Sequence, residues 1–546
     1  MTYQARHRDV ACDLKAVRRA ARPVNSPLRL HPPLSVGKAR VAFTVLTLSM
    51  TLLVGLGMAM HIASWTAWSF LAVVLVLPSL LWISGGAATA LTGMLCPPFA
   101  GTEPPATWSP AGRTAILMLL CREDPHQVAA TLTELLRQTG KAGLGPSTRL
   151  IVLSDTFGAG AVAAEEAALA PLIAAGLVDY RRRQDNTGRK PRNIAEWFDR
   201  EGRRFAYMLV LDADSRMSGA RVRRMIWRME QQPDLGLLQA GMALLPARSR
   251  FGQFQRTASR LLGPHFGAGL AAWTGTTGNY WGHNALIRTA AFTDAAHLPA
   301  LSGTAPFGGD ILSHDIIEAA VIRRGGWAVV FDPTAAGSAE DGPQDLASYH
   351  RRNRRWCQGN LQHIRLITAP GLHPLSRLHI VSGIFSFLAA PVWLCLVLLM
   401  GTGLVVLDGI IPLLLIVAVL LVPKLVGLQR LLKTRRTPHR ARVALRAFSG
   451  EVVLSTLLAP LVMLHHSAAV LSVLMGRDCG WKRPDGPRRT LPQGLPEAVT
   501  GVLLMALVLH LNPHAAVWLL PVTGPMIAAP LLIRWLNSSN PKAKAA

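Results

Sequence analysis

The chain has 546 residues, of which 50% are hydrophobic and only 16% are charged, and this balance is too apolar for an ordinary soluble enzyme. The formal net charge is +26, from 57 lysines and arginines against 31 acidic residues. Such an excess would suit a nucleic-acid-binding protein, but here the basic residues flank long apolar runs, as in membrane proteins with positively charged cytoplasmic loops. Composition therefore predicts a membrane protein with no nucleic-acid partner.

Apolar segments divide the chain. They are Val41–Ile62, Thr66–Leu95, Leu378–Leu407, Gly409–Leu428, Glu451–Met475, Glu497–Leu511 and Ala515–Leu536. Each of the first two is long enough for a helix to cross roughly 30 Å of hydrocarbon. A polar region, residues 101–377, separates the second segment from the third. The pattern predicts a soluble domain inserted between two membrane blocks.

Basic residues set the expected orientation of the chain in the lipid bilayer. The tail Arg6–Arg40 and the segments Lys433–Arg446 and Arg477–Arg489 are rich in arginine and lysine, so all three are expected on the cytoplasmic side. Because both later segments are expected inside, Glu451–Met475 between them is predicted to be an interfacial or re-entrant helix. Six spans result, with eight spans as the alternative, and both termini and the polar domain are expected in the cytoplasm.

The polar region alternates between apolar runs and helical patterns. The apolar runs are Thr114–Leu120, Arg149–Asp155, Phe205–Asp214 and Leu235–Ala240, and the helical patterns are Pro125–Gln138, Ala159–Ala175 and Gly219–Gln231. This alternation predicts an α/β fold with a mostly parallel, Rossmann-like sheet that has helices on both faces.

The expected domains follow from these boundaries. They are a basic tail (1–40), a transmembrane hairpin (41–100), the α/β domain (101–377), a second hairpin (378–428), a basic loop with the interfacial helix and a candidate gating loop (429–495), and a C-terminal hairpin and tail (496–546). The gating-loop assignment to Arg477–Arg489 depends on position alone.

Three aspartates follow apolar runs of the predicted sheet. Asp155 ends one run, and Asp212 and Asp214 end another. Ligands bind beyond the carboxyl ends of strands in such sheets, and residues i and i+2 of an extended segment point the same way. Two carboxylates suit Mg²⁺ or Mn²⁺ completed by water and phosphate oxygens. The alternative is a strand end followed by a polar turn, because chance often produces an Asp-x-Asp pair.

A further acidic residue opens the helical pattern in "GGDILSHDIIEAAVIRRGGW", residues 308–327. Asp315 lies at the start of this pattern, where it would be either an N-cap or a general base. Asp310 and His314 are competing candidates for the base. His314 is better suited to an orienting or polar-wall role.

The stretch "RRNRRWCQGNLQH", residues 351–363, combines arginines with a tryptophan. On a helix, Arg352, Arg355 and Trp356 share one face. Guanidinium groups can pair with a diphosphate, and an indole can stack on a sugar ring. A solvated basic helix is the alternative, above all for Arg351 and Arg354.

These motifs, taken in order, carry a family resemblance. Asp155, Asp212-Ala-Asp214, Asp315 and Arg352-x-x-Arg355-Trp356 resemble the D, DxD, D, Q/RxxRW set of family 2 processive glycosyltransferases, such as cellulose and hyaluronan synthases. "YWGHNALIR", "ILSHDIIEAA" and "RRWCQGNLQH" are similar to the glucan biosynthesis glucosyltransferase H family. Its members build the β-1,2-linked backbone of osmoregulated periplasmic glucans at the bacterial inner membrane. The resemblance covers roughly residues 114–374, and the membrane layout more loosely.

The resemblance implies a GT-A-like fold and a role for each aspartate. Asp155 would contact the uridine and Asp212 the donor diphosphate. Asp214 would bind Mg²⁺ or Mn²⁺, and Asp315 would be the catalytic base.

Further donor-binding residues are implied by weaker matches. Arg352 and Arg355 would bind the diphosphate, and Arg352, where cellulose synthases carry Gln, favours the periplasmic-glucan branch. Lys190 in "RKPRN" is similar to the lysine of a donor-binding K-x-G-N segment, but Arg192 replaces the glycine. Glu123 is included although the family tends to have asparagine at the preceding position.

The acceptor sugar is expected to meet aromatic residues. Tyr280, Trp281 and Trp356 are the candidates, and the first two precede Gly282, which permits close backbone approach. Ordinary core aromatics are the alternative reading of Tyr280 and Trp281. His283 and the residue after it are candidates for a polar wall.

The resemblance implies an inverting, UDP-glucose-dependent glucosyltransferase in the bacterial inner membrane. Its partners would be UDP-glucose, the growing glucan chain, the lipid bilayer and a periplasmic glucan-processing protein. Two alternatives remain: a synthase of another β-glycan (β-1,4-glucan or hyaluronan-like), and a regulator that senses a nucleotide sugar without catalysis. Asp315 argues against the regulator, because a sensor needs no base.

Overall fold

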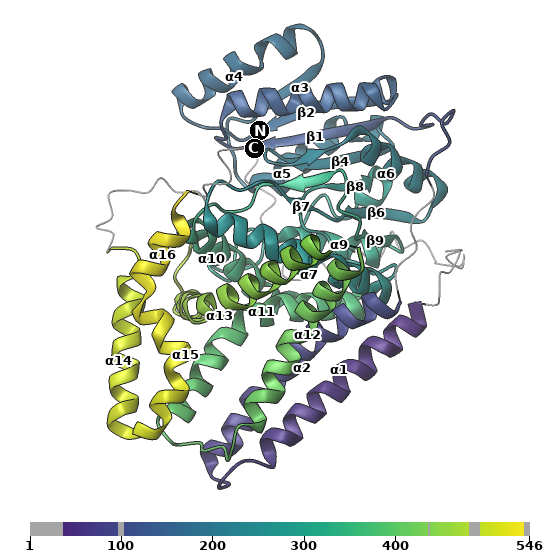
Figure 1. Cartoon of the computed structure of the whole chain (residues 1–546). Coiled ribbons are helices and arrows are strands. Elements are labelled where there is room, and N and C mark those ends of the chain that lie inside the picture. Colours follow the sequence, from purple (N-terminus) through teal and green to yellow (C-terminus); the bar gives the residue numbers. More distant parts are fainter. Residues whose placement is uncertain (1–35, 97–102, 435–436, 480–491, 540–546) are drawn as a thin grey trace.

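The chain folds into an α/β half and a helical half. The computed structural model describes residues 36–96, 103–434, 437–479 and 492–539. In Figure 1 the sheet lies in the upper part of the molecule, and the long apolar helices α1, α2, α12, α14 and α15 extend from the opposite side. Most of the predicted basic tail and of the candidate gating loop Arg477–Arg489 lies outside the described residues.

A seven-stranded sheet forms the centre of the α/β half. Its order is β3-β2-β1-β4-β8-β6-β9. The strands are β1 (Thr114–Leu120), β2 (Thr148–Ser154), β3 (Val178–Arg182), β4 (Tyr207–Asp212), β6 (Leu235–Ala240), β8 (Ala285–Arg288) and β9 (Ala328–Asp332). Strand β8 runs antiparallel to β4 and β6, while the other pairings are parallel. The predicted fold class, a mostly parallel α/β sheet, is confirmed.

A small second sheet lies beside the first. It contains β5 (Arg216–Met217), β10 (Ser338–Glu340) and β7 (Ala243–Leu244), in that order. Strand β10 brings residues from late in the α/β half next to the segment that follows β4.

Helices cover both faces of the main sheet. They are α3 (Pro125–Lys141), α4 (Ala159–Ala174), α5 (Arg189–Arg200), α6 (Gly219–Gln231), α7 (Arg250–Thr274), α8 (Thr289–Phe292), α9 (His314–Arg324) and α10 (Leu346–Gln362). Successive residues of β1 alternate between two buried clusters: Leu117 packs with residues of α5 and α9, and Met118 packs with residues of α3 and α6. Both faces of β1 are therefore apolar, which is typical of a covered parallel sheet.

The apolar helices of the second half match the predicted segments closely. They are α1 (Val36–Ala59), α2 (Ala67–Leu95), α11 (Pro374–Gly401), α12 (Ile411–Thr434), α13 (Pro438–Leu474), α14 (Leu495–Leu511), α15 (Ala516–Ile527) and α16 (Ala529–Asn537). Among the described residues, five of them (α1, α2, α11, α12 and α13) are long and apolar enough to cross a membrane. The number is up to six if the pair before and after Ala528, bent by 52°, forms one span.

Helix α13 differs from the expectation in extent. Residues 438–446, which belong to the predicted basic loop, are helical and open this helix of 37 residues. Pro438 is at its start, where a missing N–H does no harm. The helix contacts α7 and α10 of the α/β half as well as α11, α12 and α15, so it lies between the two halves. Its length and apolarity also suit a crossing, and the interfacial placement stays a prediction.

Helix α7 joins the α/β half to the first hairpin, because it packs along α2. Glycines allow the two backbones to touch. A Cβ added at Gly269 would lie 1.8 Å from the carbonyl oxygen of Thr89, and one added at Gly93 would lie 1.9 Å from that of His265. Only glycine fits at either position, so the two helices are held in direct backbone contact.

Candidate active site

The predicted aspartates meet at one edge of the sheet. Asp155 directly follows β2, and Asp212 is the last residue of β4. Strand β1 pairs with both strands in parallel, so their carboxyl ends lie on either side of it. This is the edge at which open α/β sheets bind ligands.

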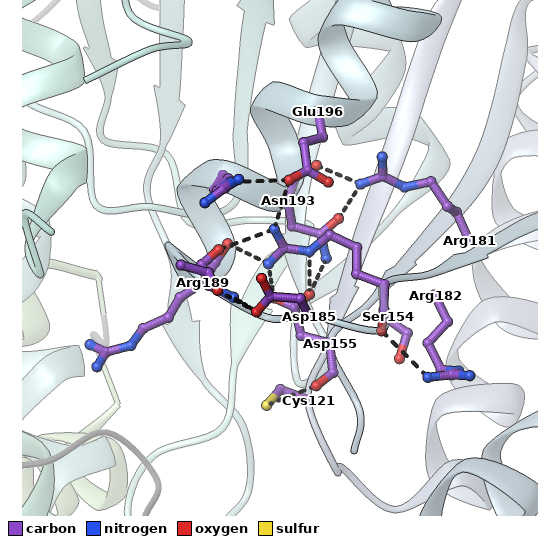
Figure 2. A network of polar contacts seen from close by, with 12 residues as sticks. Cys121, Ser154, Asp155, Arg181, Arg182, Asp185, Arg189, Asn193 and Glu196 are labelled. Atoms are coloured by element: carbon purple, nitrogen blue, oxygen red, sulfur yellow. Dashed lines mark hydrogen bonds and ion pairs between the residues drawn. The ribbon is translucent and has the colours of Figure 1, made fainter. Parts of the chain in front are cut away.

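Asp155 belongs to a buried polar network at this edge (Figure 2). Its carboxylate accepts hydrogen bonds from Arg183 Nε (2.8 Å) and Nη2 (2.9 Å) and from Asn193 Nδ2 (2.8 Å). Arg183 Nη1 also lies 3.3 Å from Glu196 Oε1. Arg183 was not predicted, although three consecutive arginines at the end of β3 were a signal. The network fixes Asp155 before any ligand binds.

Lys190 connects the first turn of α5 with the Asp-x-Asp pair. Its ammonium group forms an ion pair with Asp212. Burial acts to raise the pKa of Asp212, but the charges of Lys190 and His283 outweigh it, so the pKa is lowered. Arg192, which replaces the family's glycine, turns instead to Glu196, with Nε 3.2 Å from Oε1. The replacement therefore does not displace Lys190 from the site, and its contact with a phosphate stays a prediction.

Asp214 differs from Asp212 because no ion pair within the described residues involves it. Burial and the nearby charge of Asp212 raise the pKa of Asp214 to about 6. A divalent cation would relieve this repulsion, and carboxylate oxygens are the ligands it prefers. Among the described residues there is no group of three or more His, Cys, Asp or Glu side chains arranged to hold a metal. The pair therefore fits a cation that takes its remaining ligands from water and phosphate.

His283 adds a positive charge beside the Asp-x-Asp pair. Its Nε2 lies 3.2 Å from Glu340 Oε2 on β10. Burial works against protonation, but the hydrogen bond to Glu340 and the charges of Asp212 and Glu340 raise the pKa of His283 to about 9. The sequence suggested only a polar wall here. Glu340 was missed, since nothing in its local pattern predicts a place next to β4.

Asp315 lies in the first turn of α9 and is partly buried. Ser313, and not Asp315, is the N-cap residue, so the capping alternative is wrong. Burial raises the pKa of Asp315, and Glu318 adds to this effect, while His314 opposes it. A Cβ added at Gly282 would lie 3.6 Å from Asp315 Oδ2, which places the aromatic loop beside this carboxylate. A raised pKa suits a group that accepts a proton.

His314 is paired with its own helix. Its Nδ1 lies 2.8 Å from Glu318 Oε1, and both residues are buried. The competing base candidate, Asp310, is exposed. Of the three acidic or imidazole groups here, Asp315 is the partly buried one without such a direct side-chain partner among the described contacts.

The prediction that Tyr280 forms an acceptor platform is wrong. Its side chain is 0% exposed, and its hydroxyl donates a hydrogen bond to the carbonyl oxygen of Gly282 (2.7 Å). The ring is part of the hydrophobic core and has no surface for a sugar. Trp281 is half-buried, with its ring 4.6 Å from that of Phe331 in an edge-on contact. Contacts with strands that are distant in the sequence therefore determine where the side chains of Tyr280 and Trp281 lie.

Helix α10 presents the arginines and the exposed tryptophan together. Trp356 is 49% exposed, and the guanidinium carbon of Arg352 lies 4.5 Å from the centre of its ring. The charge of Asp214 acts on Arg352, so this helix face lies toward the Asp-x-Asp pair. Arg355 is on the same face and half-buried. An indole backed by a guanidinium group remains available on the site side of α10.

Glu123 folds back onto its own loop between β1 and α3. Its carboxylate accepts a hydrogen bond from the backbone N–H of Cys121. Arg122 in the same loop adopts φ 67° and donates its N–H to Thr156 Oγ1 (2.9 Å). Glu123 therefore shapes the loop at the edge of the site, and its contact with a donor stays a prediction.

Electrostatic interactions tie the two ends of the site together. The charge of Lys190 acts on Asp212, His283, His314 and Asp315. A single ammonium group therefore lies within reach of both the Asp-x-Asp pair and the start of α9. This arrangement can bind an anionic donor next to a partly buried proton acceptor, Asp315.

Comparison with known proteins agrees with this arrangement. Residues 207–429 match the family described as glycosyl transferase family group 2. The chain is similar to the glucans biosynthesis glucosyltransferase H of Xanthomonas campestris pv. campestris (strain B100), with 39% identity over 460 residues, or 77% of this chain and 71% of the relative. It is also similar to the protein of the same name from Xylella fastidiosa (strain 9a5c), with 38% identity over 495 residues, or 83% and 77%.

Among solved structures, a mannosyltransferase from Pyrobaculum calidifontis in complex with GDP-Man and Mn²⁺ aligns over 75% of this chain and 100% of its own, with 14% identity and a TM-score of 0.46. The similarity to the two curated relatives extends over most of their length. This chain, a family 2 glycosyltransferase, therefore belongs to the glucans biosynthesis glucosyltransferase H family.

Proposed function

We propose that the protein is an inverting glucosyltransferase that uses UDP-glucose to build the β-1,2-linked backbone of osmoregulated periplasmic glucans. The observation that carries the proposal is the convergence of Asp212, Asp214 and Lys190 with a partly buried carboxylate, Asp315, at one edge of the sheet. The curated relatives, named for glucan biosynthesis, support the product class.

The donor would bind across the carboxyl ends of β2 and β4. Asp155, held by Arg183, would contact the uridine, and Lys190, Arg352 and Arg355 would balance the charge of the diphosphate. Charge-assisted contacts of this kind are strongest in a site that excludes water. A Mg²⁺ or Mn²⁺ ion bound by Asp214 would supply Lewis acidity at the departing diphosphate.

Asp315 would remove the proton from the acceptor hydroxyl. The acceptor oxygen then bonds to the anomeric carbon of glucose while the bond to UDP breaks, and UDP leaves with the electron pair. Displacement from the opposite side converts the α-linked donor into a β-linkage. Retention through a covalent intermediate would need a second carboxylate as nucleophile, whereas direct inversion needs one base.

The linkage would be set by positioning, because a carboxylate does not distinguish one sugar hydroxyl from another. Trp281 and Trp356 would turn the terminal glucose so that its 2-hydroxyl points to Asp315. A misplacement of about 1 Å can reduce a rate roughly 100-fold. The shape of the site around the terminal glucose is therefore enough to select one of its hydroxyl groups.

The apolar helices would place the enzyme in the bacterial inner membrane. The proposed orientation keeps the α/β half and both termini in the cytoplasm, where nucleotide sugars are made. A polar glucan must then cross the bilayer, and the helices beside the site would line its path toward a periplasmic glucan-processing partner.

Linkage analysis tests the proposal. Purified full-length protein given UDP-glucose and Mg²⁺ should make glucan with predominantly 1,2 linkages by methylation analysis. A mainly 1,4-linked product would leave the transferase in place and overturn the product assignment. Tight binding of UDP-glucose with no polymer would favour the sensing regulator.

A further inference from the structure

Helix α10 has a second functional face. A cavity of about 590 Å³ lies between α10, α13, α14 and α16. From α10 it is lined by Leu346, Ala347, His350, Arg351 and Arg354, and neither Arg352 nor Arg355 takes part. Residues three and four apart share one side of a helix, so Arg355 lies next to Arg351 at the border of the cavity, while Arg352 lies further round the helix.

The cavity is strongly basic. Its lining includes Arg351, Arg354 and Arg477, and the one carboxylate among the described lining residues, Glu497, lies 2.6 Å from His465 Nε2. Among the ion pairs formed within the described parts of the chain, none involves these three arginines. The excess positive charge therefore has no acidic partner in the described protein.

The two arginines by which α10 lines the cavity make only neutral hydrogen bonds among the described residues. Arg354 Nη2 donates to Ser472 Oγ across the cavity (3.3 Å), and Arg351 Nη2 donates to Ser348 Oγ on its own helix (2.8 Å). Each guanidinium group has five N–H donors in a planar fork, so most of their donors remain for another group.

His350 adds a polar group that lacks a partner. Both of its ring nitrogens are buried, and neither has a hydrogen-bond partner within the described residues. Its ring stacks on that of His465 with centroids 3.6 Å apart. Burial and the two neighbouring histidines, His465 and His466, lower the pKa of His350 to about 3, so the ring is neutral and carries one N–H. An unsatisfied buried donor destabilises a protein unless a ligand accepts from it.

We infer that this cavity binds a phosphate ester. Planar guanidinium groups match phosphate oxygens in pairs, and the free N–H of His350 adds a donor. None of the described residues that line the cavity is Phe, Tyr or Trp, so it offers no stacking surface to a sugar. Its volume is in the range of small-molecule sites.

The position of the cavity indicates two sources of the phosphate. It lies where α10 of the α/β half meets the apolar helices α13, α14 and α16. An anionic phospholipid and a soluble phosphate compound offer the same oxygens. Binding on this side of α10 would also act on the helix that carries Arg352 and Arg355, but the inference does not depend on the proposed reaction.

Binding to full-length protein in phosphatidylcholine nanodiscs tests the site. Phosphatidylglycerol incorporated in the discs, measured by native mass spectrometry of retained lipid, probes the lipid source, and pyrophosphate titrated by calorimetry probes the soluble source. The variant is Arg351→Gln with Arg354→Gln. The matched control is Arg442→Gln with Arg446→Gln, which removes the same charge from exposed positions at the start of α13.

Wild type and control should bind at least one probe about 10-fold or more tightly than the variant, as expected for the loss of charge-assisted hydrogen bonds. Retention of phosphatidylglycerol alone identifies a lipid site, and pyrophosphate binding alone identifies a soluble ligand. Equal binding of both probes by wild type and variant overturns the inference.

A second variant tests the site in case the double variant does not fold. Arg477→Gln changes an exposed residue beyond the end of α13 and should weaken the same probe, while UDP binding stays at the wild-type level. If the double variant unfolds, this single variant decides: unchanged probe affinity overturns the site. Loss of UDP binding with intact probe binding would instead count against the proposed function alone.

Discussion

The carboxylates of the candidate active site have two opposite kinds of surroundings. Asp155 accepts two hydrogen bonds from Arg183, and Asp212 pairs with Lys190. Burial raises the pKa of both Asp214 and Asp315. The first two carboxylates are paired with cations inside the protein, while no ion pair within the described residues involves the other two.

The two kinds of carboxylate are suited to different tasks. Paired charges are preorganised, so they can position a nucleotide without rearrangement, and they stabilise the fold at the same time. Carboxylates with raised pKa values destabilise the ligand-free protein, and this is typical of groups that bind a cation or a proton in the reaction. Substitutions that affect the two kinds of carboxylate should therefore change different measured quantities.

Arg183→Ala should produce the largest effect, and on stability. It leaves Asp155 buried without its cation, which should lower the free energy of unfolding by about 3–5 kcal/mol. Thermal and denaturant unfolding in detergent measure the loss. The control is Arg182→Ala, because Arg182 lies 3.6 Å from the exposed Glu166 and should lose less than about 1 kcal/mol. Equal losses would mean that the Asp155 network contributes nothing special.

Asp315→Asn should act on chemistry. The amide keeps the shape of the side chain but cannot accept a proton at neutral pH, so glucosyl transfer should fall by roughly 100-fold or more. UDP affinity, measured by calorimetry, should stay near the wild-type value. The exposed Asp310 provides the control, and Asp310→Asn should keep its activity. Near-normal turnover of Asp315→Asn would move the base to Asp310 or His314.

Asp214→Asn should weaken metal-dependent binding and increase stability. Metal-dependent UDP binding should be lost, because an amide lacks the anionic oxygen that Mg²⁺ prefers. The pKa of Asp214, about 6 in the folded protein, lies above its usual value, so the folded state binds more protons and stability falls as pH rises from about 4 to 6. The variant should therefore be more stable than the ligand-free wild type at neutral pH, by up to about 3 kcal/mol.

The same shift predicts a pH dependence in the wild type. Mg²⁺-dependent UDP affinity should decline as pH falls through about 6, where Asp214 becomes protonated. Calorimetric titrations above and below this pH measure it. Affinity that is constant across the range, or wild-type affinity in Asp214→Asn, would contradict the assignment of the metal ligand.

Tyr280→Phe should have the smallest effect. It removes one buried hydrogen bond to Gly282, worth about 1 kcal/mol of unfolding free energy, and should leave the KM for the glucan acceptor unchanged. Trp356→Ala should show the opposite pattern. It should raise the KM for the glucan acceptor and leave the unfolding free energy nearly unchanged, because Trp356 is exposed on the site side of α10. A raised acceptor KM in Tyr280→Phe would restore the sequence-based role of this residue.

The sequence predicted the parts of the molecule that depend on local pattern. The strand at Thr114–Leu120 and the helix at Gly219–Gln231 were predicted to the residue, because their apolar spacing and flanking polar residues are local properties. Strand β8 was missed, since four residues give too little periodicity and its antiparallel insertion between β4 and β6 depends on long-range pairing. The basic start of α13 was misjudged because charge alone was taken as evidence for a loop.

The residues of the candidate site also divide into those that local sequence pattern predicts and those that depend on long-range contacts. The aspartates and the arginine–tryptophan motif stood out because their spacing brings side chains to one face. Their partners did not: Arg183 comes from β3 and Glu340 from β10, and only the folded sheet brings them to Asp155 and His283. The burial of Tyr280 likewise follows from packing that no local pattern encodes.

The glycine contact between α2 and α7 sets the spacing between the α/β half and the first hairpin. The two backbones touch at Gly93 and Gly269, so a side chain at either position would force α7 away from α2. For a polymerase of the proposed kind, this contact would keep the active site at a short and constant distance from the apolar helices that receive the product.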